Sequence, residues 1–306
     1  MEAIITVVGF LGAGKTTLLK HLMTRYVEHG WNPFVILNDY ENAQLDAEQF
    51  LQELEPEYIR ALSGSCICCS GIGELREFVN SIPERENGIT LIEANGTSDA
   101  CSLMGFLGVG LHERFLPPVQ VSVVDVKNWQ MRGEHNELEA NQIQVSSLIV
   151  LTHTDKAMDG RKEHVTNEIK ALNPLAKIIE MDELEVSLLP ELKPSANEAE
   201  KLDHLKAHWA SCSVDLPHVP DSYAIYDICT ALPKSIQRVK GCTQVGDNEG
   251  YTYFERTPDG EVYARPYRGV PITGPKLLSV GPGSEPELLQ KIIDESLAIA
   301  ANRPTA

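Results

Sequence analysis

Short, nearly continuous apolar runs alternate with helix-like segments through the first half of the chain. Runs of this kind are typical of strands covered on both faces, so the pattern predicts an α/β domain whose mostly parallel sheet has helices on both sides. Ligands of such sheets bind beyond the carboxyl ends of the strands, which is where we expect the polar residues after each run to meet. The runs span residues 3–8, 34–37, 89–92, 121–124 and 148–151, and the polar residues that follow them include Asn38-Asp39, Glu93, Asp125 and Thr152 to Asp155.

The pattern changes after residue 187. Prolines at 190, 194, 217 and 220 indicate a linker over 188–220, around a short helix at 198–209. Beyond it, residues 221–306 predict a smaller α+β domain with a strand at 223–228, a short helix opening at Pro233 and hairpins over 239–264. The last helix has apolar residues on one face, namely Leu288, Leu289, Ile292, Ile293 and Leu297. The predicted organisation is therefore an α/β domain over 1–187, the linker, and a C-terminal α+β domain.

The segment GFLGAGKT, from Gly9 to Thr16, fits the phosphate-loop pattern GxxxxGK(S/T) between a predicted strand and a predicted helix. Its glycines let backbone N–H groups point at phosphate oxygens, and the helix N-terminus adds partial positive charge. Lys15 would reach the β- and γ-phosphates, and the Thr16 hydroxyl would bind Mg²⁺. The first domain is thus predicted to be a P-loop NTPase whose phosphate-binding residues are Gly12, Ala13, Gly14, Lys15, Thr16 and Thr17.

The composition of the chain indicates its cellular location and excludes some classes of partner. The chain has 306 residues, 42% of them hydrophobic, and no apolar stretch approaches the roughly 20 residues that span a bilayer. The N-terminal strand runs straight into the phosphate loop without a cationic leader, which predicts a cytoplasmic protein that uses no membrane. The net charge of −18 argues against nucleic acid as a partner, because phosphate backbones are held by clustered Lys and Arg.

Three cysteines crowd into the segment SGSCICCSG, at Cys66, Cys68 and Cys69. Adjacent cysteines pair only with strain, and disulfides are rare in a reducing compartment. Thiolates favour Zn²⁺ and Cu⁺, so a metal site is predicted, with its other ligands from a carboxylate, a histidine, water or a client protein. Such an incompletely closed site suits metal transfer. Buried structural cysteines are the alternative, which the flanking Ser and Gly residues disfavour.

The phosphate loop followed by CICC resembles the CobW-like GTPases, metal-handling P-loop proteins related to the maturation factors of urease and hydrogenase. Other similar elements are Asn38-Asp39, Glu93-Ala94-Asn95-Gly96, Val124-Asp125 and Arg238-Val239-Lys240-Gly241. The resemblance implies a GTP-driven metallochaperone or metalloenzyme activator that loads Zn²⁺ or Co²⁺ onto a client metalloprotein.

The resemblance also implies roles for single residues. Glu93 would act with Lys15 in catalysis by orienting the Mg²⁺ shell or the attacking water, and a buried pair with Lys15 is the alternative. The N–H of Gly96 would bind the γ-phosphate, so that its loss releases the segment. Asp39 would contact Mg²⁺ or the transferred metal, with an ordinary turn aspartate as the alternative. Asp125 is expected to be structural.

The segment that should read the base departs from the family pattern. Thr152-His153-Thr154-Asp155 stands where GTP-binding proteins have Asn-Lys-x-Asp. Asp155 keeps the carboxylate that selects guanine, whereas Thr152 loses an amide and His153 must supply the stacking surface. Each lost contact would weaken binding by ~1 kcal/mol, so GTP is predicted and ATP stays open.

Two other functions remain open at this point. One is a nucleotide-binding scaffold or activator with a structural zinc and little hydrolysis, and the other is a P-loop kinase for a small molecule, which leaves CICC without a role. For a GTPase we expect low turnover, because no arginine finger is identifiable. The client, the metal and a homodimer are not determined by the sequence.

Overall fold

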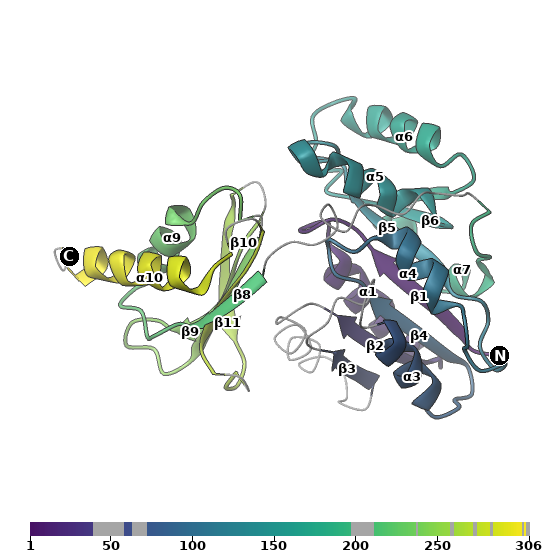
Figure 1. The fold of residues 1–306 in the computed structure, drawn as a ribbon, viewed down its shortest axis with the longest axis horizontal. Coiled ribbons are helices and arrows are strands. Elements are labelled where there is room, and N and C mark those ends of the chain that lie inside the picture. Colours follow the sequence, from purple (N-terminus) through teal and green to yellow (C-terminus); the bar gives the residue numbers. More distant parts are fainter. Residues whose placement is uncertain are drawn as a thin grey trace. The chain divides into compact units, whose positions relative to one another are not determined.

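The computed structural model describes residues 1–38, 58–62, 72–196, 211–236, 238–257, 260–271, 274–281, 284–301 and 303. The chain divides into two compact units, Met1–His208 and Trp209–Ala306, each of which has its own sheet (Figure 1). Asp39, Cys66, Cys68 and Cys69 lie outside the described residues. So does the whole of the predicted short helix at 198–209.

The first unit is built on a seven-stranded sheet, and every strand pair described in it is parallel. The strand order is β3-β2-β4-β1-β5-β6-β7, which puts β1 at the centre. The strands are β1 (Ala3–Val8), β2 (Asn32–Asn38), β3 (Ile59–Leu62), β4 (Gly88–Glu93), β5 (Val119–Asp125), β6 (Leu148–Thr152) and β7 (Lys177–Glu180). The five predicted strands and their parallel arrangement are confirmed, and the sequence analysis missed the two edge strands, β3 and β7.

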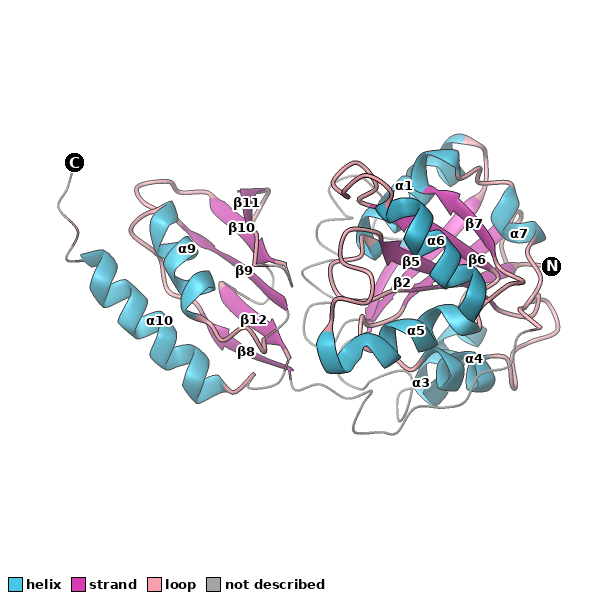
Figure 2. Ribbon diagram, turned by 90° about the horizontal axis from the view of Figure 1, so that it is seen from above, coloured by secondary structure: helices cyan, strands magenta, loops and turns pink. Residues whose placement is uncertain are grey.

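Helices cover both faces of this sheet, as predicted. The apolar residues of α1 and α7 pack with one face of β1, and those of α3 and α4 pack with the other. Helices α5 and α6 extend the layer of α3 and α4 across β5 and β6 (Figures 1 and 2). The bounds are α1 (Lys15–Glu28), α3 (Ile72–Ser81), α4 (Ala100–Leu107), α5 (Asn136–Gln144), α6 (Arg161–Leu172) and α7 (Leu188–Glu191).

The contact between β5 and α5 is polar although it is fully buried. Gln120 Nε2 on β5 donates to the carbonyl oxygen of Gln142 at 2.6 Å and to Ser146 Oγ at 2.8 Å. Ser122 Oγ donates to the same Gln142 carbonyl at 2.6 Å. Buried polar groups stabilise the fold only when they are hydrogen-bonded, and these hydrogen bonds form only when β5 and α5 are aligned in one particular way. This β5–α5 polar seam, made of Gln120, Ser122, Gln142 and Ser146, therefore fixes the position of α5 on the sheet.

The second unit has a five-stranded sheet in the order β11-β10-β9-β12-β8, with antiparallel pairing throughout the described strand pairs. Two helices, α9 and α10, pack along one face of it (Figure 2). The apolar face predicted for α10 is confirmed, because all five of its residues belong to or pack against this core. The bounds are β8 (Ser211–Asp215), α9 (Ser222–Ala231), β9 (Arg238–Gln244), β10 (Tyr251–Arg256), β11 (Val262–Tyr267), β12 (Lys276–Val280) and α10 (Pro286–Ala301).

Two local predictions in this unit are wrong. The predicted strand at 223–228 is helix α9, which starts where Asp221 Oδ1 accepts the N–H of Ala224 at 2.8 Å. Its buried residues are Ala224, Ile225, Ile228 and Cys229, which have the three-to-four-residue spacing of a helix. In so short an apolar segment, this spacing is hard to distinguish from the alternation of a strand. Pro233 opens a turn and not a helix.

Arg256 explains that turn. Its guanidinium donates to the carbonyls of Cys229 at 2.8 Å and Leu232 at 2.9 Å, and its Nη2 donates to Pro233 at 3.2 Å and to Ile236. One buried side chain thus satisfies the carbonyls at the end of α9 and in the following turn, which replaces further helical hydrogen bonds.

Strand β8 and helix α7 both fall within the span predicted as a linker: β8 belongs to the second sheet, and Leu189 of α7 to the first core. No helix among the described residues combines the length and the apolar character needed to cross a bilayer.

Candidate functional site

The phosphate loop connects the central strand β1 to α1. Gly9 has a φ of 150°, and a Cβ there would lie 2.5 Å from the carbonyl oxygen of Val123, so only glycine fits. Gly14, with a φ of 96°, is the left-handed residue from which α1 begins at Lys15. The N–H of Ala13 closes a turn onto the carbonyl of Phe10 at 3.1 Å. The loop therefore has the tight backbone that phosphate binding requires.

The charged and hydroxyl groups predicted to act on phosphate gather at this loop. Lys15 Nζ donates to the carbonyl of Gly9 at 2.9 Å, which folds the lysine back over its own loop. Thr16 Oγ1 donates to Glu93 Oε1 at 3.0 Å, across from the neighbouring strand β4. Lys15 and Glu93 are both buried. The arrangement brings an ammonium, a hydroxyl and a carboxylate together, which is a donor set suited to a triphosphate with a hard divalent cation.

The turn at 95–98 lies directly against the phosphate loop. A Cβ on Gly96 would meet Leu11 Cδ2 at 2.4 Å and Leu11 N at 2.9 Å. Within the turn, the N–H of Ser98 donates to the carbonyl of Asn95 at 3.0 Å, and the N–H of Thr97 donates to Asn95 Oδ1 at 3.1 Å. Among the described residues, none accepts a hydrogen bond from the buried N–H of Gly96. A donor next to the phosphate loop is therefore left available.

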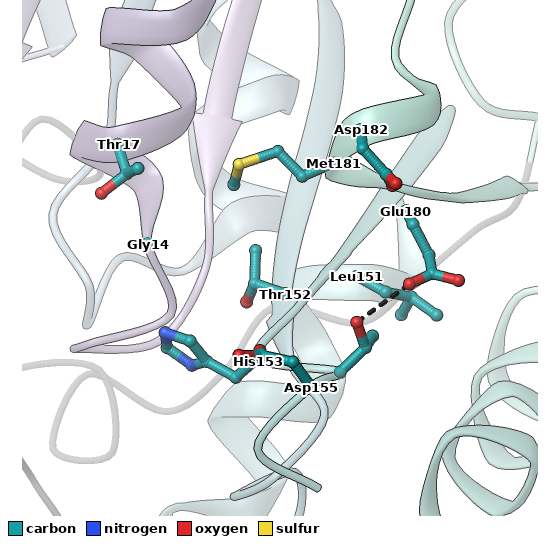
Figure 3. Close-up of a pocket in the computed structure, with 10 residues that line it drawn as sticks. Gly14, Thr17, Leu151, Thr152, His153, Asp155, Glu180, Met181 and Asp182 are labelled. Carbon is teal, nitrogen blue, oxygen red and sulfur yellow. Dashed lines mark hydrogen bonds between the residues drawn. The ribbon is translucent and has the colours of Figure 1, made fainter.

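A pocket of about 300 Å³ opens beside Gly14 (Figure 3). It is lined by Gly14, Thr17, Leu151, Thr152, His153, Thr154, Asp155, Glu180, Met181 and Asp182. Its volume is at the lower end of the range of small-ligand sites, roughly 300–1,000 Å³. Three carboxylates and one thioether line it, so it offers hydrogen-bond acceptors together with apolar surface.

The segment from Thr152 to Asp155 forms one wall of this pocket. Thr152 Oγ1 lies 2.8 Å from the carbonyl of Ala13 and 3.1 Å from that of Val124, so the threonine ties the pocket to the phosphate loop. His153 has a positive φ of 54°, and Asp155 is exposed. Thr152 stands where the family pattern has an asparagine, and its hydroxyl still contacts the phosphate loop.

The imidazole of His153 contacts Asp125, which lies at the end of β5. Its Nδ1 lies 3.1 Å from Asp125 Oδ1. Burial alone would raise the pKa of Asp125, but hydrogen bonds from His153 and Asn128, with the charge of Arg132, hold that pKa below its usual value of 3.8. Asp125 Oδ2 accepts from Asn128 Nδ2 at 2.8 Å, which caps the strand end as expected, and its bond to His153 was not anticipated.

Arg132 links this carboxylate to the phosphate loop. Its guanidinium carbon lies 4.8 Å from the centre of the Phe10 ring. Its nitrogens lie 3.6 Å from Asp125 Oδ2 and 3.5 Å from Glu139 Oε1, and all three charged side chains are 4% exposed. Burial raises the pKa of Glu139 above its usual value of 4.5 despite the opposing effect of Arg132. The segment Thr152–Asp155 and the phosphate loop therefore both contact one buried cluster of charged side chains.

The opposite wall of the pocket was missed by the sequence analysis. It comes from the end of β7 and the short 3₁₀ turn Met181–Glu183. Thr154 Oγ1 donates to Glu180 Oε2 at 2.9 Å, and Figure 3 shows the Met181 side chain extending toward Thr17. Had β7 been recognised, the rule that ligands bind beyond parallel strand ends would have pointed to these residues.

The predicted metal ligands other than Thr16 cannot be placed, because Asp39, Cys66, Cys68 and Cys69 are outside the described residues. Within the part of the chain that is described, no three His, Cys, Asp or Glu side chains are grouped so as to hold a metal ion. The described cysteines 101, 212, 229 and 242 form no disulfide.

The parallel sheet, the glycine-rich loop and its position before α1 define a P-loop NTPase with a separate small C-terminal domain. Residues 3–180 match the family model for the CobW/HypB/UreG nucleotide-binding domain. The chain belongs to this family, which confirms the predicted resemblance.

Curated relatives were found by sequence. The zinc chaperone YjiA of Escherichia coli (strain K12) is 29% identical over 170 residues, 53% of this chain and 52% of the relative. The zinc-regulated GTPase metalloprotein activator 1 of Dictyostelium discoideum is 24% identical over 209 residues, 56% of this chain and 44% of the relative. The chain thus spans about half the length of the curated relatives it matches.

Solved structures were compared as well. The crystal structure of Zn(II)-bound YjiA GTPase from E. coli aligns over 96% of this chain and 98% of that chain, with 17% identity and a TM-score of 0.43. The hydrogenase maturation factor HypB from Archaeoglobus fulgidus aligns over 58% and 80%, with 21% identity and a TM-score of 0.38.

Proposed function

We propose that this protein binds GTP with Mg²⁺, hydrolyses GTP slowly, and uses that cycle to load Zn²⁺ or Co²⁺ onto a client metalloprotein in the cytoplasm. The observation that carries the proposal is the grouping of Lys15, the Thr16–Glu93 pair and the available Gly96 N–H around the phosphate loop. Membership of the CobW/HypB/UreG family supports it, as do relatives named a zinc chaperone and a zinc-regulated GTPase metalloprotein activator.

The triphosphate would be held by the loop residues Gly12 to Thr17. Lys15 already lies over the loop, where it would exchange the Gly9 carbonyl for phosphate oxygens. Bound Mg²⁺ would neutralise charge on the phosphates, with Thr16 as a ligand and with Glu93 and Asp39 as further candidates. The Thr16 hydroxyl can keep donating to Glu93 while its lone pairs face a cation, so the observed bond fits the group.

The base would occupy the pocket beside Gly14. Guanine presents its N1–H and amino donors on one edge, which an ionised Asp155 can accept in pairs. The imidazole of His153, which Asp125 fixes in place, would supply stacking surface. A pocket whose charged side chains are all acceptors favours guanine over adenine, which presents an acceptor at N1.

Slow hydrolysis is part of the proposal. Arg132 contacts the phosphate loop, but it does so through Phe10, and its side chain is buried between two carboxylates. It is therefore engaged as a structural charge, while fast phosphoryl transfer commonly needs an arginine on the transferred group. Glu93 would orient the attacking water.

The proposed metal-binding step depends on which segments follow strands β2 and β3 in the chain. Asn38 of β2 and Leu62 of β3 are partners in register at the carboxyl edge of the sheet, the edge that also carries Glu93. Asp39 follows Asn38, and the segment with Cys66, Cys68 and Cys69 follows Leu62. This supports a model in which the γ-phosphate closes the segments after β2 and β4 and so assembles the thiolates around the cargo ion. Hydrolysis would then release the ion to the client.

Phosphate release from GTP by the wild type and by Lys15→Ala tests the nucleotide half of the proposal. We expect slow release that Lys15→Ala abolishes. Transfer of phosphate to a small acceptor would instead indicate a kinase. Nucleotide binding without any release would favour the scaffold, which the altered Thr152–Asp155 segment makes the second candidate.

Zn²⁺ and Co²⁺ titrations with a GTP analogue, with GDP and without nucleotide test the metal half. We expect the tightest metal binding with the analogue and its loss in Cys66→Ala. Equal affinity in all three states would refute the coupling of nucleotide to metal.

A further inference from the structure

Helix α5 reaches the turn at 95–98 through one side chain. Gln142 Nε2 donates to the carbonyl of Gly96 at 3.0 Å and to the carbonyl of Ser98 at 3.2 Å. Two carbonyl oxygens can be approached only by the NH₂ end of an amide, so the orientation of the side chain follows from its surroundings. Gln142 is 1% exposed, so its amide is enclosed by protein.

With these two bonds, three carbonyls of the turn are hydrogen-bonded. The carbonyl of Asn95 accepts from Ser98, and those of Gly96 and Ser98 accept from Gln142. With its carbonyls engaged, the turn keeps the peptide planes on both sides of Gly96 from rotating. The N–H of Gly96 is the group left without a described acceptor, next to Leu11 of the phosphate loop.

The amide of Gln142 is itself only half satisfied. Its Oε1 is buried and has no hydrogen-bond partner, and the same holds for Ser98 Oγ. A buried unpaired acceptor costs about 1–3 kcal/mol, a cost that Gln142 shares with Gln120, whose Oε1 is also unpaired. The backbone carbonyl of Gln142, in contrast, accepts from Gln120 and Ser122 in the β5–α5 polar seam, which holds the residue in position.

We propose that Gln142 is a positioning residue that fixes the Gly96 peptide so that its N–H can bind the γ-phosphate, and thereby sets the preference for GTP over GDP. The inference rests on the proposed function. Gln142 does not touch the nucleotide in this scheme, and its effect passes through the carbonyls of Gly96 and Ser98. GDP lacks the γ-phosphate and so gains nothing from an oriented Gly96.

The test compares Gln142→Leu and Gln142→Met with Asn173→Leu, a matched loss of a buried amide that donates to the carbonyls of Ile143 at 2.7 Å and Ser146 at 2.9 Å, and not to the turn or to Gln142. Dissociation constants for a nonhydrolysable GTP analogue and for GDP are measured with Mg²⁺, alongside thermal melting. We expect the Gln142 variants to bind GDP as the wild type does and to lose about tenfold in triphosphate preference, the value of one charge-assisted hydrogen bond. Asn173→Leu should lower the melting temperature and leave that preference intact.

A folded Gln142 variant with the wild-type preference would overturn the proposal, as would an equal loss in Asn173→Leu. In the wild type, amide exchange gives a second measurement: the Gly96 N–H should gain protection with the GTP analogue and not with GDP. Equal protection by both nucleotides would also overturn it. A wild type that binds neither nucleotide would instead refute the proposed function, so the two failures are distinguishable.

Discussion

Asp155 is the side chain on which base selection depends in the proposed function. It lines the pocket beside Gly14 and is exposed, on the segment that Thr152 ties to the phosphate loop. Replacing it by asparagine keeps the shape but exchanges one carboxylate oxygen for an amide that donates. The donors on guanine would then face a donor.

The expected loss follows from these contacts. A hydrogen bond to a charged group contributes about 1.5–3 kcal/mol, and the exposure of Asp155 argues for the lower value. Two such bonds give about 3 kcal/mol, which is roughly a 150-fold rise in the Kd for GTP. Xanthosine triphosphate carries a carbonyl where guanine has its amino group, so Asp155→Asn should bind it more tightly than the wild type does.

Competition against a fluorescent nucleotide measures all of these constants in one assay. Asp159→Asn is the matched control, because Asp159 is an exposed aspartate of the same loop that does not line the pocket. The reasoning would be refuted by a wild type that binds ATP as tightly as GTP, or by Asp155→Asn binding GTP with unchanged affinity.

Three further predictions concern stability. Arg132→Met leaves Asp125 and Glu139 without a counter-charge and should lower the free energy of unfolding by about 3 kcal/mol in urea titrations, with part of the loss recovered by adding Glu139→Gln. Folding lowers the pKa of Asp125, so the ionised carboxylate stabilises the folded state fully above the unfolded pKa of 3.8, and this stabilisation is lost as the pH falls through the folded pKa. Thermal melts of Asp125→Asn should therefore show a lower melting temperature than the wild type at pH 7 and a smaller decrease in acid. Arg256→Met removes the side-chain donor of four carbonyls around the end of α9, of which, among the described residues, only that of Pro233 keeps another donor, the N–H of Ile236, and should lower the unfolding free energy of the C-terminal unit by about 3 kcal/mol. Arg265→Met, at an exposed position, should change it little.

Much of the first unit was predictable because its strands are buried on both faces. Continuous apolar runs leave few alternatives to a parallel sheet, and all five predicted strands are present. The edge strands β3 and β7 are only four residues long and contain exposed positions, so no run marks them. Helix α9 was mistaken for a strand because its buried apolar residues come in adjacent pairs, which do not clearly distinguish helical from strand periodicity. The N-cap residue Asp221 is not by itself enough to identify a helix.

The site was predictable where a local motif or the end of an apolar run marks its residues. The phosphate loop could be identified from adjacent residues, and the structure groups Lys15, Thr16 and Glu93 there. The contacts of His153 with Asp125 and of Gln142 with Gly96 join elements far apart in the chain, and neither residue type signals its partner. Such pairs depend on the three-dimensional packing of α5 and β6 against β5.

The central position of β1 has a consequence for how the protein is made. The phosphate loop follows the first strand of the chain, yet the neighbours of β1 among the described strands are β4 and β5, which lie between Gly88 and Asp125. During synthesis, the nucleotide-binding loop therefore emerges early but cannot acquire its folded support until more than 100 further residues have followed. A ribosome-bound chain should consequently gain no nucleotide affinity before β5 has left the exit tunnel, and the pocket beside Gly14 needs the ends of β6 and β7 as well.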